Sequence, residues 1–334
     1  MKTNLYILFL ILSMVGLQSC FEKDVLVPKH NSGDIQSAEI EMAEDYKYQV
    51  YFDLGTNKVI SSNHKTDWDL AFESSDTGYS IIMNNSKFMK MLVVGVTNFY
   101  AAFDTTGGNW KFDEPSGHTD SMAIGKWADL SKNPPISYKS VYAIDLGMNE
   151  EGNQLGYRKI QLLAYNEGYY LKYAELDGGK EDSLLIPKDT DRNYAYFSFK
   201  NGGKQVNIEP LKTNWDLHFT QYSHVLYTDE GEAVPYLVLG VLLNPFKVLA
   251  TVLKDTDFDN ISFSTVNHLS LLNQRDIIGY EWKKYSFTNG TYEVNSQDVY
   301  IIQDTDGFLY KFRFISFYNQ QGDKGFPTVE LQKL

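Results

Sequence analysis

Apolar and polar residues alternate along this chain in short runs that are bounded by Gly, Asn and Asp. Residues 194–199, 299–302 and 310–315 are clear examples, and residues 201–203, Asn-Gly-Gly, have the composition of a tight turn. Side chains on a strand point alternately to opposite faces, so a period of two predicts strands with one buried face. Helical periodicity is nearly absent. We therefore predict a mainly β fold of antiparallel, β-rich domains.

One eight-residue motif occurs twice. Residues 65–72 read KTDWDLAF, and residues 212–219 read KTNWDLHF, 147 positions further on. The same offset also pairs apolar and Gly positions upstream of the motif without a gap. Self-similarity over such a period indicates repeated domains, and each unit is large enough to hold its own core. We predict two tandem domains over residues 45–176 and 189–334, joined by a linker at residues 177–188.

Trp68, Asp69, Trp215 and Asp216 are the most distinctive residues of the repeated motif. Strand alternation places each tryptophan on the face opposite its neighbouring aspartate, so the tryptophans are predicted to face the core. Asp side chains readily accept hydrogen bonds from nearby backbone N–H groups. We therefore expect Asp69 and Asp216 to accept from donors in the preceding turn, and we interpret all four residues as marking the fold rather than catalysing a reaction.

The N-terminus has the pattern of a lipoprotein signal peptide. Lys2 precedes an apolar run at residues 5–15, which is too short for a comfortable membrane span, and Ser19 stands directly before Cys20. Cys20 is the only cysteine of the chain. We predict removal of residues 1–19, acylation of Cys20 and attachment to a membrane through the lipid, followed by a polar tether at residues 20–44.

The net charge and the absence of catalytic motifs exclude several classes of function. The formal net charge of −13 makes nucleic acid an unsuitable partner, and it leaves membrane attachment to the lipid rather than to a basic patch. The chain has no Gly-x-Ser-x-Gly elbow, no His-Glu-x-x-His and no phosphate-binding Gly-rich loop. We therefore expect a protein that is not an enzyme. A β-rich glycosidase stays open as an alternative, because its two carboxylates need no local motif.

Both copies of the motif lie in a context that resembles the HmuY family. A strand, a Gly-containing turn and a second strand precede Trp-Asp-hydrophobic-x-hydrophobic in each copy, and residues 307–319 and 325–330 are similar to the closing strands of that family. The doubling departs from the single unit of the founding architecture. The resemblance implies a surface-exposed outer-membrane lipoprotein that grips haem between two loops and passes it to a TonB-dependent receptor.

The family pattern does not supply the iron ligands directly. Its second axial histidine lies five residues after a tryptophan, but Lys132 follows Trp127 at this distance, and Phe287 follows Trp282. His118 and His268 are the remaining histidine candidates for haem iron, each in a polar stretch upstream of its tryptophan.

The candidate haem-contacting residues are His118, Met122, His268, Tyr285, Phe287 and Tyr292. The aromatic members are expected to form an apolar wall for a flat macrocycle, although core packing explains them as well. Lys132 and Phe287 favour an alternative, a module of the same fold that has lost haem ligation and binds another ligand, a protein or a glycan. A haemophore would place His118 with Met122, or His268 with Tyr285 or Tyr292, across one cleft.

Overall fold

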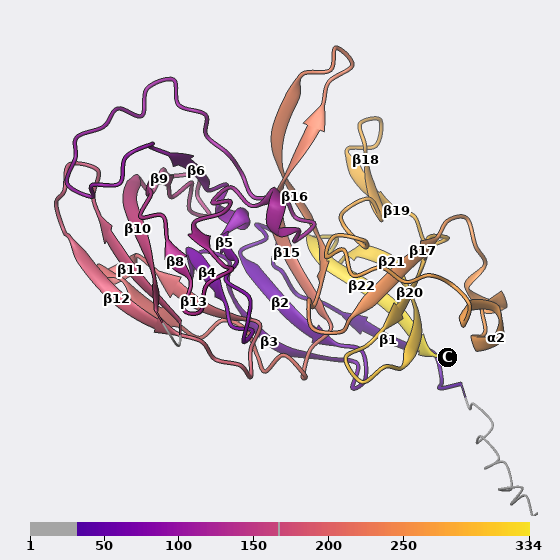
Figure 1. Cartoon of the computed structure of the whole chain (residues 1–334). Coiled ribbons are helices and arrows are strands. Elements are labelled where there is room, and N and C mark those ends of the chain that lie inside the picture. Colours follow the sequence, from indigo (N-terminus) through magenta and orange to yellow (C-terminus); the bar gives the residue numbers. More distant parts are fainter. Residues whose placement is uncertain (1–31, 166–167) are drawn as a thin grey trace, which may run out of the picture. The chain divides into compact units, whose positions relative to one another are not determined.

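The computed structural model describes residues 32–165 and 168–334 of the chain (Figure 1). The predicted signal peptide at residues 1–19, Cys20 and the first part of the predicted tether lie outside the described residues. Within the described part, no helix is both long enough and apolar enough to cross a membrane. The described residues form a mainly β, antiparallel fold, which confirms the predicted class.

Four sheets carry most of the strands. One has the order β1 (Gln36–Glu39), β22 (Lys324–Lys333), β21 (Leu309–Tyr318), β20 (Val299–Gln303), β17 (Leu249–Leu253). A second has the order β12 (Asp182–Pro187), β11 (Gly168–Ala174), β10 (Tyr157–Tyr165), β9 (Val141–Asp145), β6 (Lys90–Val93). The third is β14 (Lys204–Val206), β13 (Tyr194–Ser198), β4 (Leu70–Glu73), β5 (Ile81–Met83). The fourth is β16 (Ala233–Leu243), β15 (Leu217–Tyr227), β2 (Tyr48–Asp53), β3 (Lys58–His64).

The remaining described elements are short. Two small hairpins are β7 (Ala128–Asp129) with β8 (Ile136–Ser137) and β18 (Lys283–Ser286) with β19 (Thr291–Val294). The helical turns are η2 (Asn85–Lys87), η3 (Thr119–Ser121), η4 (Lys200–Gly202), η5 (Phe258–Asn260) and α2 (Phe263–Val266).

Each four-stranded sheet combines strands from both sequence repeats. The hairpin β2–β3 precedes the first Trp-Asp motif, yet β2 pairs with β15, which follows Asp216 of the second motif. In return, the segment β13–β14 precedes the second motif and pairs through β13 with β4, which follows Asp69 of the first. Figure 1 shows the indigo β2 beside β15. The two repeats have therefore exchanged the hairpins that precede their motifs.

The hydrophobic cores follow this exchange rather than the repeats. One core combines buried residues between positions 70 and 186 with Phe197 from the second repeat. The other combines buried residues between positions 217 and 331 with Phe52 from the first repeat. We call residues 70–186 with β13–β14 the first body, and residues 36–64 with 217–334 the second body. The expectation that each repeat holds its own core is therefore corrected, because each core takes one hairpin from the other repeat.

Asp69 and Asp216 form hydrogen bonds with the exchanged hairpins. The backbone N–H of Phe199 donates to Asp69 Oδ2 over 2.6 Å, and the N–H of Leu54 donates to Asp216 Oδ2 over 2.8 Å. Each aspartate in turn donates its own N–H to a carbonyl of the same hairpin, that of Phe197 or Phe52, over 2.8 Å. The donors thus belong to the other repeat and not to the preceding turn, which corrects the expected partner.

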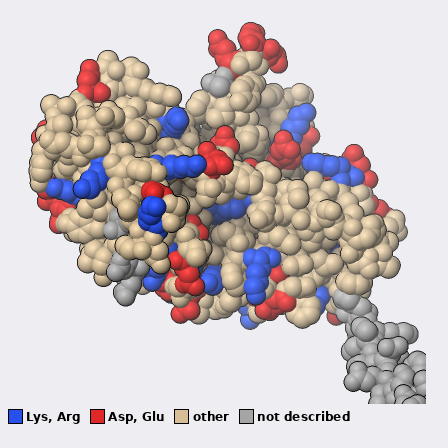
Figure 2. Space-filling model, in the orientation of Figure 1, with Lys and Arg blue, Asp and Glu red and all other residues tan. Residues whose placement is uncertain are grey.

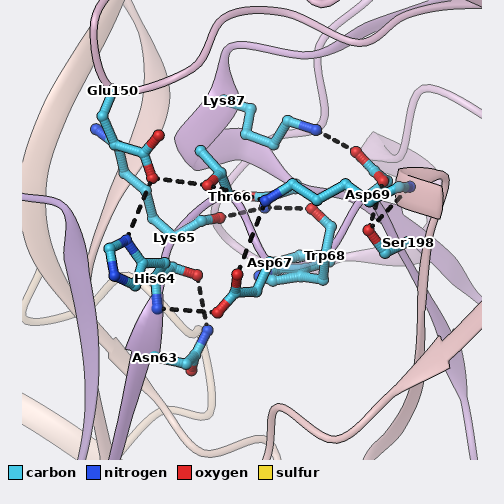
Figure 3. A network of polar contacts seen from close by, with 12 residues as sticks. Asn63, His64, Lys65, Thr66, Asp67, Trp68, Asp69, Lys87, Glu150 and Ser198 are labelled. Atoms are coloured by element: carbon cyan, nitrogen blue, oxygen red, sulfur yellow. Dashed lines mark hydrogen bonds and ion pairs between the residues drawn. The ribbon is translucent and has the colours of Figure 1, made fainter.

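The two aspartates differ in their second partner. The carboxylate of Asp69 forms an ion pair with Lys87, and both side chains are only 2% exposed (Figure 3). Ser198 also donates to Asp69 Oδ2 over 3.2 Å. Asp216 instead accepts the backbone N–H of Thr305 at Oδ1 over 2.9 Å. Burial raises the pKa of Asp216 to about 7, because desolvation disfavours the ionised carboxylate.

The predicted tether is shorter than expected. Residues 36–39 form β1, which pairs with β22 along Leu331 to Thr328. The side chains of Ile40 and Met42 that follow are fully buried in the second body. The period-two placement of these two apolar residues is the strand signal that the polar composition around them obscures.

Candidate functional site

A groove of about 570 Å³ lies in the second body beside the hairpins β15–β16 and β18–β19, which project in the same direction (Figure 1). This volume is within the range of small-molecule sites, about 300–1,000 Å³. We call it the hairpin groove. Its lining residues are Tyr46, Gln221, Leu226, Tyr236, Leu237, Val238, Leu239, Tyr280, Lys283, Lys284, Tyr285, Phe287, Tyr292 and Lys324.

The β18–β19 hairpin places aromatic residues on this groove. Tyr285 and Tyr292 are cross-strand partners. In the turn that joins the two strands, Gly290 N–H donates a hydrogen bond to Ser286 O over 2.8 Å. Gly290 has a φ of +66°, a left-handed conformation that glycine adopts without strain. Phe287 begins the turn, and its side chain is 92% exposed. An apolar ring this exposed does not belong to the packed core.

The groove aromatics form a ladder that reaches the core. The rings of Phe287 and Tyr285, of Tyr285 and Tyr292, and of Tyr292 and Phe317 each stand edge to face with centroids 5.1 Å apart. Phe317 is fully buried. Below it, Trp282 stacks on Phe314 with centroids 3.9 Å apart. The exposed end of the ladder is therefore held in place by a packed base, which lowers the entropy that a ligand must remove.

The other wall comes from the long β15–β16 hairpin. Leu226 and Tyr236 line the groove and are 36% and 56% exposed. Beyond them, the turn at residues 228–232 carries three acidic side chains, and Figure 2 shows this acidic tip. The tip thus differs in character from the apolar wall below it.

The charge of the groove is opposite to that of the protein. Lys283, Lys284 and Lys324 line it, and no Asp or Glu is among its lining residues, although the chain has a net charge of −13. Lys283 donates from Nζ to Leu239 O over 2.6 Å and lies over the Trp282 ring. Burial lowers the pKa of Lys283 to about 7, because desolvation disfavours the ammonium form. An apolar groove with these cations is suited to an apolar, anionic ligand.

The structure brings together only part of the predicted haem site. Tyr285, Phe287 and Tyr292 line the hairpin groove. Met122 packs in the core of the first body and also lines a separate cavity of about 600 Å³, and His118 is exposed immediately before η3. His268 is exposed after α2, and neither histidine is among the groove residues. The predicted His118–Met122 and His268–tyrosine pairs therefore do not face each other across this groove.

His218 does not supply the missing ligand, and His224 packs on Tyr280 with ring centroids 5.1 Å apart but does not line the groove. His218 stacks on Tyr51 with ring centroids 4.4 Å apart at the junction of the two bodies. Burial lowers the pKa of His218 to about 3, so the imidazole is neutral and structural at physiological pH. Among residues 32–165 and 168–334, no group of three or more His, Cys, Asp or Glu side chains is placed to hold a metal ion.

Sequence reasoning missed the far wall and the cations of the groove. Tyr46 and Lys324 are far apart in the sequence, near the beginning and the end of the segments that make up the second body. No local pattern connects them with Tyr236 or Lys284. One signal was available, because the strands of β15–β16 are 11 residues long, well above the usual 5 or so. Apolar residues near the turn of such a long hairpin extend beyond what a core can cover.

The described residues define a β-rich protein with two sequence repeats. The HmuY protein family model matches residues 45–173 and 190–331, so the chain belongs to the HmuY family, and the predicted tandem organisation is confirmed. HmuY proteins are binding proteins rather than enzymes, and members of the family bind haem. No curated protein matches this sequence.

Three solved structures resemble the chain over most of its length. Apo PinO from Porphyromonas gingivitis is 10% identical, with a TM-score of 0.29, over 90% of this chain and 97% of that one. The apo HmuY analogue TFO from Tannerella forsythia is 10% identical, with a TM-score of 0.26, over 91% and 97%. A candidate HmuY-like haem-binding protein from Bacteroides vulgatus is 13% identical, with a TM-score of 0.24, over 89% and 90%.

Proposed function

We propose that this protein captures haem or a related tetrapyrrole in the hairpin groove. The observation that carries the proposal is an aromatic groove with three lysines and no carboxylate among its lining residues, on a protein of net charge −13. A tetrapyrrole is flat, apolar and, through its carboxylates, anionic. Its ring plane could stack on Tyr285 and Phe287, and its carboxylates could form ion pairs with Lys284 and Lys324.

The cellular setting belongs to the same proposal. Acylation of Cys20 would anchor the mature chain to the outer membrane, with the body exposed at the cell surface. A binding protein held there could transfer its tetrapyrrole to a TonB-dependent receptor. Family membership and the lipoprotein pattern at the N-terminus support this setting.

The test is a haemin titration of residues 21–334, which contain the whole compact unit of residues 32–334. We expect a saturable change in the Soret band. Reversing two groove charges with Lys284→Glu and Lys324→Glu is expected to weaken binding by at least about tenfold, because both carboxylate contacts become repulsive.

The matched control reverses two exposed strand lysines away from the groove, Lys58→Glu and Lys204→Glu, so that net charge changes equally. An equal loss in both double variants would assign the effect to overall charge and contradict a groove site. His118→Ala and His268→Ala complete the set. A large loss in either would place the iron at that histidine instead.

Affinity for the ligand is expected to fall as the pH rises above about 7. Lys283 is largely neutral above that value in the free protein, and ligand carboxylates held in the same groove by Lys284 and Lys324 would raise its pKa, so binding takes up a proton there. Each further pH unit then weakens binding by up to about tenfold, whereas below pH 7 the ammonium is already present. Dissociation constants from pH 6 to 9 measure this, and Lys283→Met should give a flatter profile. An unchanged slope in that variant would contradict it.

A second candidate function is docking of a protein or glycan at the same groove. It is favoured by the 92% exposure of Phe287 and by the position of His118 and His268 outside the groove. A haemin titration without a saturable change would select this function.

A further inference from the structure

We propose that the hairpin groove recognises the macrocycle and carboxylates of its ligand and not the metal, so that a metal-free porphyrin binds as tightly as haem. This inference rests on the proposed function, since it concerns the same groove. The groove suits a flat dianion, but no histidine, cysteine or methionine lines it that could bind the iron.

The donor set of the groove is the first support. Haem iron in proteins is held by His, Cys, Met or Tyr. None of the residues that line the hairpin groove is a histidine, a cysteine or a methionine. Phe287 presents an exposed ring that can stack on a macrocycle but has no donor atom for iron.

The tyrosines of the groove are the second support. A phenol must lose its proton to become a good iron ligand. Burial raises the pKa of Tyr46, of Tyr280 and of Tyr292, which makes loss of the phenol proton more costly at these three positions. Tyr285 and Tyr236 remain, and the experiment below removes both hydroxyl groups.

Lys283 is the remaining nitrogen donor to consider. Its Nζ donates to Leu239 O over 2.6 Å and lies 4.2 Å from the Trp282 ring centroid and 5.2 Å from that of Phe317. The amine is therefore held against the aromatic base of the groove. An iron bond would require the side chain to leave this position.

What remains for binding is contact that is independent of the metal. Stacking on Tyr285 and Phe287 depends on the π-face of the macrocycle, and pairing with Lys284 and Lys324 depends on its carboxylates. Haemin and metal-free protoporphyrin share both features. The axial bond, which would separate them, has no histidine, cysteine or methionine partner in the groove.

The experiment compares haemin, metal-free protoporphyrin IX and gallium protoporphyrin IX by quenching of intrinsic fluorescence in residues 21–334. We expect the three dissociation constants to agree within about threefold, a difference of about 0.7 kcal/mol. Phe287→Ala should weaken all three ligands by a similar factor. The double variant Tyr236→Phe and Tyr285→Phe should bind all three as the parent protein does.

The outcomes separate this inference from the proposed function. Haemin binding more than tenfold tighter than the metal-free porphyrin would overturn it while leaving tetrapyrrole capture intact. If that preference disappeared in the double tyrosine variant or in Lys283→Met, the responsible ligand would be identified. Failure of all three tetrapyrroles to bind would instead overturn the proposed function itself.

Discussion

Replacing Asp69 with Asn is expected to lower the free energy of unfolding by about 3–5 kcal/mol, because it leaves the buried ammonium of Lys87 without its counter-charge. Both side chains are only 2% exposed, so water cannot take the place of the carboxylate. The same substitution also weakens the acceptor of Phe199 N–H, which fastens the exchanged β13–β14 segment. Urea unfolding followed by circular dichroism measures the effect.

Asp216→Asn is the matched control, since Asp216 occupies the corresponding position in the second repeat. Its two oxygens accept from Leu54 N–H and Thr305 N–H, and an amide offers only one oxygen for these two donors. The expected cost is therefore about 1–3 kcal/mol, that of one unsatisfied buried donor. Equal costs for the two variants would show that the Asp69–Lys87 pair is not what makes the first site more sensitive. A Lys87→Met change in the Asp69→Asn background should recover part of the loss.

Truncating the exchanged aromatic residues is expected to destabilise the body made mainly from the other repeat. Phe52 belongs to the first repeat but packs in the core of the second body, whereas Phe197 belongs to the second repeat and packs in the core of the first body. Both are fully buried. Phe52→Ala and Phe197→Ala should each cost about 3–5 kcal/mol, through lost burial and the cavity left behind.

Hydrogen exchange locates the damage. Phe52→Ala should lower protection in β20–β22, and Phe197→Ala should lower it in β9–β11, because those strands carry the contacted cores. Each variant serves as the control for the other. Loss of protection confined to the repeat that carries the substitution would contradict the exchange of hairpins.

The repeated motif explains why the exchange was not predicted from sequence. Both hairpins precede nearly the same eight residues, so the alternation that pairs β2 with β15 would equally pair it with β4. Local pattern therefore identifies strands and their buried faces but not which copy a hairpin joins. The role of Asp69 and Asp216 as acceptors of backbone N–H groups was recognisable, because the residue type suggests it. Their partners were not, since these lie 130 and 162 residues away.

The residues of the candidate site also fall into those that could be predicted from the sequence and those that could not. Tyr285, Phe287 and Tyr292 could be predicted together, because they lie close in the chain on one hairpin. Tyr236, Lys324 and Tyr46 could not, because only the packing of the second body brings them to the same groove. His118 and His268 were singled out by residue type, yet backbone placement leaves both outside it.

The sequence by itself determined the β class, the twofold repeat and the membership of the HmuY family, because these depend on alternation, periodicity and motif, all of which are local properties. The tertiary structure alone decided the exchange of hairpins, the burial of the Asp69–Lys87 pair and the basic character of the hairpin groove. Each of these depends on contacts between residues far apart in the chain. Such contacts are selected by the packing of a whole core, and no local pattern encodes them.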